Sequence, residues 1–324
     1  MRVLVVGGAG YIGAHMALML TQSGHEVVVL DNLSTGHRAA VRWGPLEEVS
    51  LADSRGLDAV FCGRRFDAVM HFAAASLVGE SVQDPLKYYR NNVADVVVLL
   101  DAMRRAGVGR LIFSSTAAVF GEPQQDLIDE RHPLQPINPY GASKLMVERM
   151  LADCAAAYGL RAVALRYFNA AGAEAAAGIG ESHHPETHLI PRLLRRAAGE
   201  DFEMRIFGDD YPTADGTCIR DYIHVSDLCQ AHLLALQYLD AHSGFHTFNL
   251  GNGQGYSVKQ VVAAVEQVIG RSLGIEVAAR RPGDPARLVA SSAKARAELG
   301  WRPQHADLAQ IVESAWHWHR QPVY

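Results

Sequence analysis

The sequence predicts an α/β protein in which a doubly wound parallel sheet is joined to a smaller α+β domain. Short apolar segments alternate with helical segments through the first half of the chain, and a glycine-rich turn follows the first apolar segment directly. The alternation becomes irregular after Asn169, where a stretch rich in Ala and Gly begins. Because parallel strands are joined by crossovers that are usually helices, the regular part indicates a sheet covered by helices on both faces.

The composition is that of an ordinary globular protein, with 49% hydrophobic and 20% charged residues in a chain of 324. The 30 Lys and Arg residues are outnumbered by 35 Asp and Glu, and the net charge of −5 argues against a general nucleic-acid-binding protein. No apolar run approaches the ~20 residues that span a bilayer, and the first strand is expected to begin at residue 2. We therefore expect a cytoplasmic protein with neither a nucleic acid nor a membrane as partner.

The strands of the first half are expected near Val3, Val28 and Val49 and over residues 67–72, 110–115 and 161–168. Two long helices are expected over 85–107 and 140–159, where apolar residues recur at spacings of three and four. Each carries more apolar surface than one face of a sheet requires. We expect a homodimer built on these helices, and a thick core is the alternative explanation.

The second half is expected to be a smaller domain, so that residues 1–171 form the first domain and 172–324 the second. Helices are expected over 189–198, 226–242 and 257–269 and in two closing segments. Strands are expected over 204–207, 219–225, 246–250 and 275–281. Their irregular order indicates that part of this half, about 222–250, crosses back onto the main sheet.

The strand, turn and helix at the N-terminus indicate a dinucleotide site. Residues 2–6 run into GGAGYIG, in which Gly7, Gly10 and Gly13 are spaced as GxxGxxG. Glycine is needed there because a Cβ would keep the backbone from a pyrophosphate, which binds at the N-terminus of the next helix. The second strand ends at Asp31, whose carboxylate can accept ribose hydroxyls and repels a 2′-phosphate. The segment therefore predicts a Rossmann-type fold that binds NAD rather than NADP.

A second group of polar residues predicts a proton relay. Tyr140 and Lys144 are four residues apart in NPYGASK and so share one face of a helix. A nearby cation would lower the pKa of a phenol, ordinarily about 10, by roughly two to three units. Thr116 follows a predicted strand, at the edge where ligands bind in open α/β sheets. We expect Tyr140 to act as a base, with Lys144 and Thr116 beside it.

The cysteines and two groups of histidines indicate neither a disulfide framework nor a metal site. The cysteines lack a CxxC pair, so we expect small buried hydrophobic residues at Cys62, Cys154, Cys218 and Cys229. The histidines are expected on a polar loop and a terminal helix without acidic or cysteine partners: His183, His184, His188, His317 and His319. We therefore expect no metal site.

A series of motifs runs through the whole chain: GGAGYIG, DNLS, HFAA, YYRNNV, FSST, YGASK, RYFNAAGA, FGDDYPTADGTCIRDYIHV and NLGNG. Together they resemble the extended short-chain dehydrogenase/reductase family, and within it the nucleotide-sugar 4-epimerases. The resemblance implies a bound NAD that accepts a hydride from C4 of a UDP-hexose while Tyr140, directly or through Thr116, takes the hydroxyl proton. The 4-keto sugar then turns over and is reduced on its other face.

The resemblance also implies binding residues and a UDP-sugar-binding role for residues 172–324. The implied NAD contacts are Gly7, Gly10, Tyr11, Ile12, Gly13, Asp31, Asn32, Asp53, Phe72, Ala73, Ala74, Asn92, Lys144 and Phe168. The implied UDP-sugar contacts are Thr116, Tyr140, Asn169, Leu189, Phe207, Arg220, Arg281 and Asp284. Arginine forks on the diphosphate would anchor the substrate while the sugar turns.

Several positions distinguish this chain from its relatives. Ala117 and Ala118 stand where related dehydratases and decarboxylases place acids, so simple epimerisation is favoured. Ser76 stands where many epimerases have a lysine, and His188 where several have an asparagine, which leaves those two contacts open. Leu288 occupies a position that is bulky in enzymes confined to the plain hexose, which suggests a pocket that admits an N-acetyl group.

Two other functions stay open at this point. The chain could be a 4-epimerase or oxidoreductase for another nucleotide sugar, such as a UDP-pentose, because the fold and the relay would be unchanged. It could also be an NAD-binding sensor without activity, although the presence of Tyr140 and Lys144 argues against that function.

Overall fold

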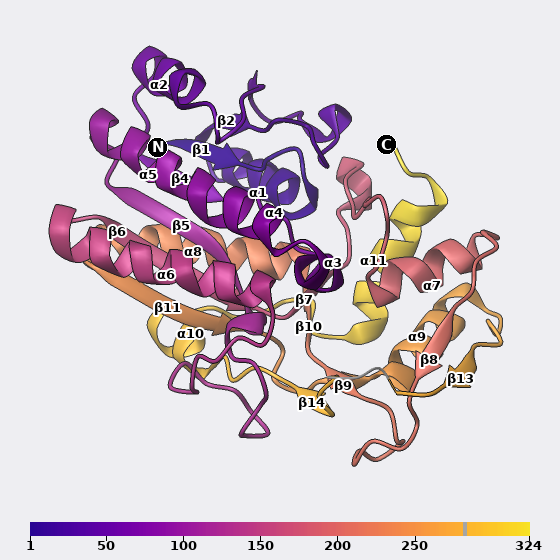
Figure 1. Ribbon diagram of the computed structural model, residues 1–324. Coiled ribbons are helices and arrows are strands. Elements are labelled where there is room, and N and C mark those ends of the chain that lie inside the picture. The colour runs from indigo at the N-terminus through magenta and orange to yellow at the C-terminus, as the bar shows by residue number, and fades with distance from the viewer. Residues whose placement is uncertain (281–283) are drawn as a thin grey trace.

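The computed structural model describes residues 1–280 and 284–324 and is organised around a parallel sheet of seven strands (Figure 1). The strands lie in the order β11, β6, β5, β4, β1, β2, β3. Their bounds are Arg2–Val6 (β1), Glu26–Leu30 (β2), Leu46–Glu47 (β3), Ala68–His71 (β4), Arg110–Thr116 (β5), Arg161–Tyr167 (β6) and Phe245–Leu250 (β11). The chain moves outward from β1 in one direction and then from β4 in the other, which confirms the doubly wound fold.

Helices cover both faces of this sheet because successive side chains of each strand point to opposite sides. Val3 and Val5 of β1 pack with α1 (Tyr11–Gln22) and α8 (Val225–Ala241). Leu4 and Val6 pack in a second core on the opposite face. The helices of that core include α2 (Ser54–Gly63), α5 (Asp95–Ala106) and α6 (Pro139–Tyr158). The sheet is therefore buried on both faces, as its nearly continuous apolar strands require.

The second half of the chain adds a separate core and also returns to the main sheet. The helices of this core are α7 (Leu189–Ala197), α9 (Val258–Ile269) and α11 (Leu308–Arg320). Strand β11 pairs in parallel with β6, and α8 packs against α1. Among the described residues no helix is long and apolar enough to cross a membrane.

Short strands complete the second half in three small sheets. Strand β7 (Asn169–Ala171) pairs with β10 (Tyr222–His224), and β8 (Arg205–Phe207) pairs with β13 (Glu276–Ala278). The third sheet holds β12 (Tyr256–Ser257), β9 (Ile219–Arg220) and β14 (Arg287–Leu288). The short helix α10 (Ala293–Glu298) follows β14.

The strand expected near Val49 is β3, which ends two residues earlier, at Glu47. Two other expectations about the elements are wrong, as is the expected burial of Cys62. The helix expected over 85–107 is divided into α4 (Pro85–Tyr89), a π-helical segment over Arg90–Ala94, and α5. The strand expected over 219–225 is two strands, β9 and β10, in different sheets. Cys62 is exposed on α2 rather than buried.

Candidate active site

The predicted site residues gather where five neighbouring strands end. Gly7 follows β1, Asp31 follows β2, Phe72 follows β4, Thr116 ends β5 and Phe168 follows β6. These strands are parallel and adjacent, so their carboxyl ends lie along one edge of the sheet. Ligands of open α/β sheets bind at this edge, close to where the strand order reverses.

The glycine turn is shaped by close packing of backbone on backbone. Gly7 has a φ of +79°, and a Cβ there would lie 2.5 Å from the nitrogen of Ala73. A Cβ on Gly13 would lie 2.1 Å from the carbonyl oxygen of Gly7. A Cβ on Gly10 would lie 3.4 Å from the carbonyl oxygen of Gly7, which is an ordinary van der Waals contact. Of these three, Gly7 and Gly13 are therefore the two glycines whose replacement would clash with backbone atoms at this turn.

Helix α1 begins at this turn and suits an anion. Its N-cap residue, Gly10, has no side chain to bind the free N–H groups of the first turn, which include those of Tyr11 and Ile12. Asp31 is buried and accepts hydrogen bonds from the N–H groups of Ala9 (3.0 Å) and Leu33 (2.8 Å). Each carboxylate oxygen keeps a lone pair for a further donor, such as a ribose hydroxyl. The turn and the carboxylate thus fit the two ends of an adenosine diphosphate.

Asn92 fixes the loop that follows β4, which contains Phe72, Ala73 and Ala74. Its amide oxygen accepts a hydrogen bond from Ala75 N (2.9 Å), and its amide nitrogen donates to Ala75 O (2.9 Å) and to Ser143 Oγ (3.0 Å). The residue is buried in the π-helical segment, a feature that often marks functional sites. The structure therefore gives Asn92 a positioning role for the loop.

Two other predicted NAD contacts lie farther out on the surface. Asn32 is exposed, and its side chain accepts a hydrogen bond from Ser34 N. Asp53 is exposed and caps α2 by accepting a hydrogen bond from Gly56 N (3.0 Å). Their contacts with NAD stay predictions.

Tyr140, Thr116 and Lys144 come together at the carboxyl end of β5. Asn138 caps α6 by accepting a hydrogen bond from Gly141 N (2.8 Å), which places Tyr140 in the first turn. Tyr140 is hydrogen-bonded to Thr116. One turn later, Lys144 is buried and its ammonium donates to Ser114 O (2.8 Å).

The electrostatics of this group differ from the sequence expectation. Burial raises the pKa of Tyr140, and the hydrogen bond with Thr116 only partly opposes this. Burial lowers the pKa of Lys144 to about 7, against the opposing charge of Glu148. The expected lowering of the Tyr140 pKa by Lys144 is therefore wrong for the chain by itself, because burial disfavours the charged phenolate. A phenolate at Tyr140 needs additional positive charge.

A buried ion pair holds α6 against the sheet and was not expected from the sequence. Glu148 and Arg166 are joined at 3.0 and 2.5 Å, with only 3% and 4% of their side chains exposed. Ser115 also donates to Glu148 (2.6 Å). Tyr140, Lys144 and Glu148 are spaced by four and so lie on one face of α6. This spacing is the signal that could have identified Glu148.

The residues expected to hold the UDP-sugar lie beyond the sheet edge. Arg220 of β9 donates to Asp284 Oδ1 (2.8 Å) and to the carbonyl of Pro285 (2.9 Å), so the structure joins two predicted residues. Asn169 donates to the carbonyl of Asp221 (2.8 Å). Arg281 lies outside the described residues.

Four predicted apolar residues lie at or next to element ends around this region. Leu189 begins α7, and Phe207 ends β8. Phe168 and Leu288 pack against the same small core, which contains Val119. Leu288 therefore lies beside the end of β5, as a pocket-lining role requires.

Asp221 was missed by sequence reasoning, although it adjoins Arg220. Its buried carboxylate accepts hydrogen bonds from the N–H groups of Asn252 (2.8 Å), Gly253 (3.1 Å) and Ala290 (3.0 Å). It thereby ties the NLGNG segment to β14.

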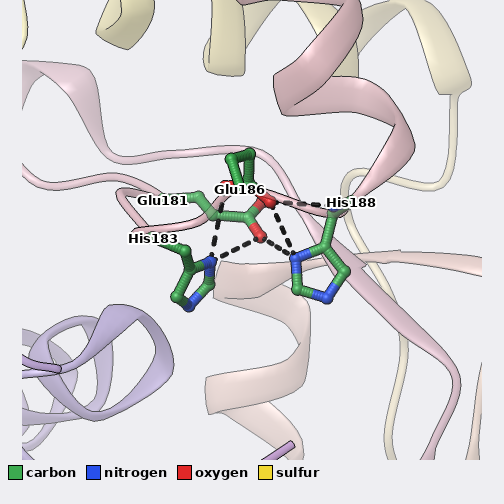
Figure 2. A group of neighbouring side chains, drawn as sticks. All are labelled: Glu181, His183, Glu186 and His188. Carbon is green, nitrogen blue, oxygen red and sulfur yellow. Dashed lines mark hydrogen bonds and ion pairs between the residues drawn. The ribbon is translucent and has the colours of Figure 1, made fainter. Parts of the chain in front are cut away.

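The expectation that the loop histidines lack acidic partners is wrong. His183 and His188 both lie against Glu181 and Glu186 (Figure 2). The segment ESHHPETH brings these partners together by local spacing, and the repeated Glu-x-His pair was the signal that could have shown it.

We expect Glu148→Ala to lower the free energy of unfolding by ~3–5 kcal/mol, because it leaves the Arg166 charge buried without a partner. Chemical denaturation measures the change. The control is Arg131→Ala, which removes an ion pair to Asp129 whose arginine is 92% exposed and should leave the free energy of unfolding nearly unchanged. Equal effects of the two substitutions would contradict this account of α6.

Comparison with known proteins identifies the family. A sequence model of the NAD dependent epimerase/dehydratase family matches residues 3–251. A UDP-glucose 4-epimerase from Halalkalibacterium halodurans is 51% identical over 99% of this chain and 96% of its own length.

Solved structures agree in fold. The crystal structure of UDP-glucose 4-epimerase from Brucella ovis in complex with NAD is 50% identical, with a TM-score of 0.94 and 97% of each chain covered. The UDP-Glc/GlcNAc 4-epimerase from Campylobacter jejuni is 43% identical, with a TM-score of 0.88 and 99% of each chain covered. Together with the glycine turn, Asp31 and the group around Tyr140, these matches show that the chain belongs to the NAD-dependent epimerase/dehydratase family.

Proposed function

We propose that this chain interconverts UDP-galactose and UDP-glucose by inverting C4 through a transient 4-keto sugar. The observation that carries the proposal is the contact between Tyr140 and Thr116 at the same sheet edge as the glycine turn. The name of the H. halodurans relative, which matches nearly the whole chain, supports the same substrate.

The chain's own residues would move the proton of the C4 hydroxyl. NAD, when bound, supplies a hydride acceptor for C4 and a positively charged ring. Tyr140 would accept the proton from the C4 hydroxyl, directly or through Thr116, and would return it to the same oxygen once the sugar has turned over. Because burial opposes a phenolate at Tyr140, the positive charges of Lys144 and of the cofactor together favour that state.

The substrate would be anchored through its nucleotide rather than its sugar. Arg220 is partly buried and fixed by Asp284, so its guanidinium is preorganised for a diphosphate. The other contacts proposed for the UDP-sugar are Asn169, Leu189, Phe207 and Arg281. A sugar gripped loosely at one end can present either face to the same base.

The domain division and the location follow from this function. We propose that residues 1–171 bind NAD and that 172–324 bind the UDP-sugar, with the segment at about 222–250 contributing to the main sheet. Both ligands are metabolites of the cytoplasm, where we place the protein.

The direct test supplies UDP-galactose to the purified protein without added cofactor. UDP-glucose should form, because the cofactor is regenerated in each cycle. If product forms only when stoichiometric NAD is added, the protein is an oxidoreductase. If no product forms at all, the protein is a sensor.

Tyr140→Phe should reduce turnover by ~10² or more, the usual effect of losing a general base, with NAD content unchanged. Tyr158→Phe is the matched control at the exposed end of the same helix, and its turnover should equal that of the wild type. Near wild-type turnover of the Tyr140 variant would remove Tyr140 from the mechanism.

The size of the sugar pocket is proposed to depend on Leu288. Leucine there would leave space for an N-acetyl group. The name of the C. jejuni enzyme, to which this chain is similar, includes the N-acetylated sugar GlcNAc. We expect turnover of UDP-N-acetylgalactosamine as well as UDP-galactose, and expect Leu288→Tyr to reduce only the former. Negligible turnover of the acetylated sugar by the wild type would contradict this, and preferred turnover of a UDP-pentose would favour the alternative substrate class.

A homodimer is proposed on the apolar helix face formed by Val82, Leu86, Val97 and Met146. These side chains are 63%, 59%, 48% and 42% exposed. They lie on α3 (Val78–Gln83), α4, α5 and α6, of which α3 and α4 contact α6. Exposed apolar groups gathered on neighbouring helices are typical of an interface.

Light scattering of the purified protein tests the dimer. The wild type should have twice the mass of one chain, and Val82→Glu should be a monomer. Val323→Glu, at a residue that is also exposed but near the C-terminus, should remain dimeric. A monomeric wild type would contradict the proposal.

A further inference from the structure

Four side chains of one short segment converge on a single point, away from the group around Tyr140. They are Glu181, His183, Glu186 and His188, and one potential ligand atom from each lies within 4.8 Å of all the others (Figure 2). The glutamates are deeply buried, with 5% and 2% of their side chains exposed. Two carboxylates this close and this buried require positive charge between them.

Three of the four nitrogen–oxygen distances across the cluster are close to the spacing between ligands of a four-coordinate ion, and the fourth is shorter. Nδ1 of His188 lies 2.7 Å from Glu181 Oε1 and 3.3 Å from Glu186 Oε1. Nδ1 of His183 lies 3.3 Å from Glu181 Oε1 and 3.5 Å from Glu186 Oε2. Ligand atoms about 2.1 Å from a tetrahedral zinc ion stand about 3.4 Å from one another. A small ion could therefore take its place between these atoms with little movement.

The polar groups of the cluster are not satisfied by hydrogen bonds alone. Nδ1 of His183 is buried and has no hydrogen-bond partner of good geometry. One oxygen of Glu186 is fixed by the N–H groups of Thr187 (2.7 Å) and His188 (2.8 Å). Its other oxygen remains directed at His183.

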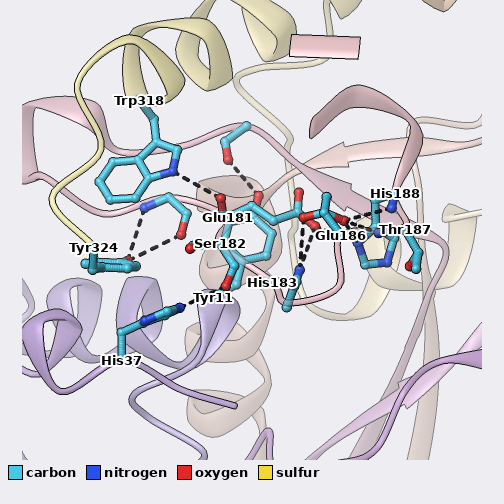
Figure 3. Close-up of polar contacts among 12 residues, drawn as sticks. Tyr11, His37, Glu181, Ser182, His183, Glu186, Thr187, His188, Trp318 and Tyr324 are labelled. Carbon is cyan, nitrogen blue, oxygen red and sulfur yellow. Dashed lines mark hydrogen bonds and ion pairs between the residues drawn. The ribbon is translucent and has the colours of Figure 1, made fainter. Parts of the chain in front are cut away.

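Contacts from distant parts of the chain hold the segment in this shape (Figure 3). Trp318 of α11 donates to the carbonyl of Glu181 (3.1 Å), and a ring nitrogen of His37 lies 3.0 Å from the carbonyl of Ser182. The ring of Tyr11, at the start of α1, packs edge-on against His183. The cluster is therefore preorganised, as metal sites in folded proteins are.

We infer that Glu181, His183, Glu186 and His188 form a binding site for a divalent transition-metal ion of the zinc class. Imidazole nitrogens select such ions over Mg²⁺ and Ca²⁺, which prefer oxygen ligands. Four protein ligands leave no open position for a reacting water, so the role is structural. The ion would tie the segment to the start of α7 at Leu189 and to the start of α1 at Tyr11.

The alternative is that protons alone neutralise the cluster. The two carboxylates raise the pKa of His183 to about 9 and that of His188 to about 10, although burial acts in the opposite direction. Arg195 and His319 also interact electrostatically with these glutamates. Two imidazolium groups would balance the charge without an ion, so only direct binding measurements distinguish the two.

The test uses the full chain, stripped with a chelator and titrated calorimetrically with Zn²⁺. The wild type should bind one zinc ion per chain, its Tm should rise, and Co²⁺ in place of Zn²⁺ should give the visible absorption of a tetrahedral site. His188→Asn should lose the bound ion and the Tm shift. The asparagine has a precedent in related epimerases, so this variant is expected to fold, and metal-free circular dichroism verifies it.

The matched control is His184→Gln, which changes the exposed histidine between the ligands and should bind zinc as the wild type does. His183→Gln provides a second ligand variant with the same expected loss. Absence of saturable zinc binding by the wild type would overturn the inference, as would equal binding by the wild type and both ligand variants. Zinc content and spectra are independent of sugar turnover, so failure here is separable from failure of the proposed epimerase activity.

Discussion

The docking of α6 onto the carboxyl ends of β5 and β6 fixes the positions of Tyr140 and Lys144. Tyr140, Lys144 and Glu148 follow one another at successive turns of α6. Tyr140 contacts Thr116, and Lys144 donates to the carbonyl of Ser114. Glu148 accepts hydrogen bonds from Ser115 and Arg166. Burying the charges of Glu148 and Arg166 costs desolvation free energy, which the hydrogen bonds between them offset. Its rigid geometry keeps the phenol at the edge of the sheet, where the glycine turn opens.

Near the glycine turn, the same edge of the sheet is held together by packing of one backbone segment on another. The approach of Gly7 to Ala73 joins the turn after β1 to the loop after β4, and Asn92 ties that loop to α6 through Ser143. The glycine turn and the group around Tyr140 are thus parts of one connected network. In the proposed function, a substrate held by its nucleotide would present its sugar to that network.

The features that could be predicted from the sequence are those that depend on the local pattern of residues. Strand β1, the glycine turn and Asp31 were predictable because periodicity and spacing along the chain determine them. Glu148 and Arg166 were not, because their partnership arises only when α6 lies on β6. The pKa of Tyr140 was misjudged because spacing places Lys144 nearby but does not reveal the burial of the phenol, which raises its pKa. The partners of His183 and His188 were overlooked, although their spacing was visible.

In the proposed reaction, the hydrogen of C4 would be held on bound NAD and returned to C4 of the same sugar, and Tyr140 would handle only the proton of the hydroxyl. The most direct measurement uses UDP-galactose carrying deuterium at C4, converted in ordinary water and analysed by mass spectrometry. The account predicts that the UDP-glucose formed retains deuterium at C4. Replacement of that deuterium by hydrogen from the solvent would contradict it.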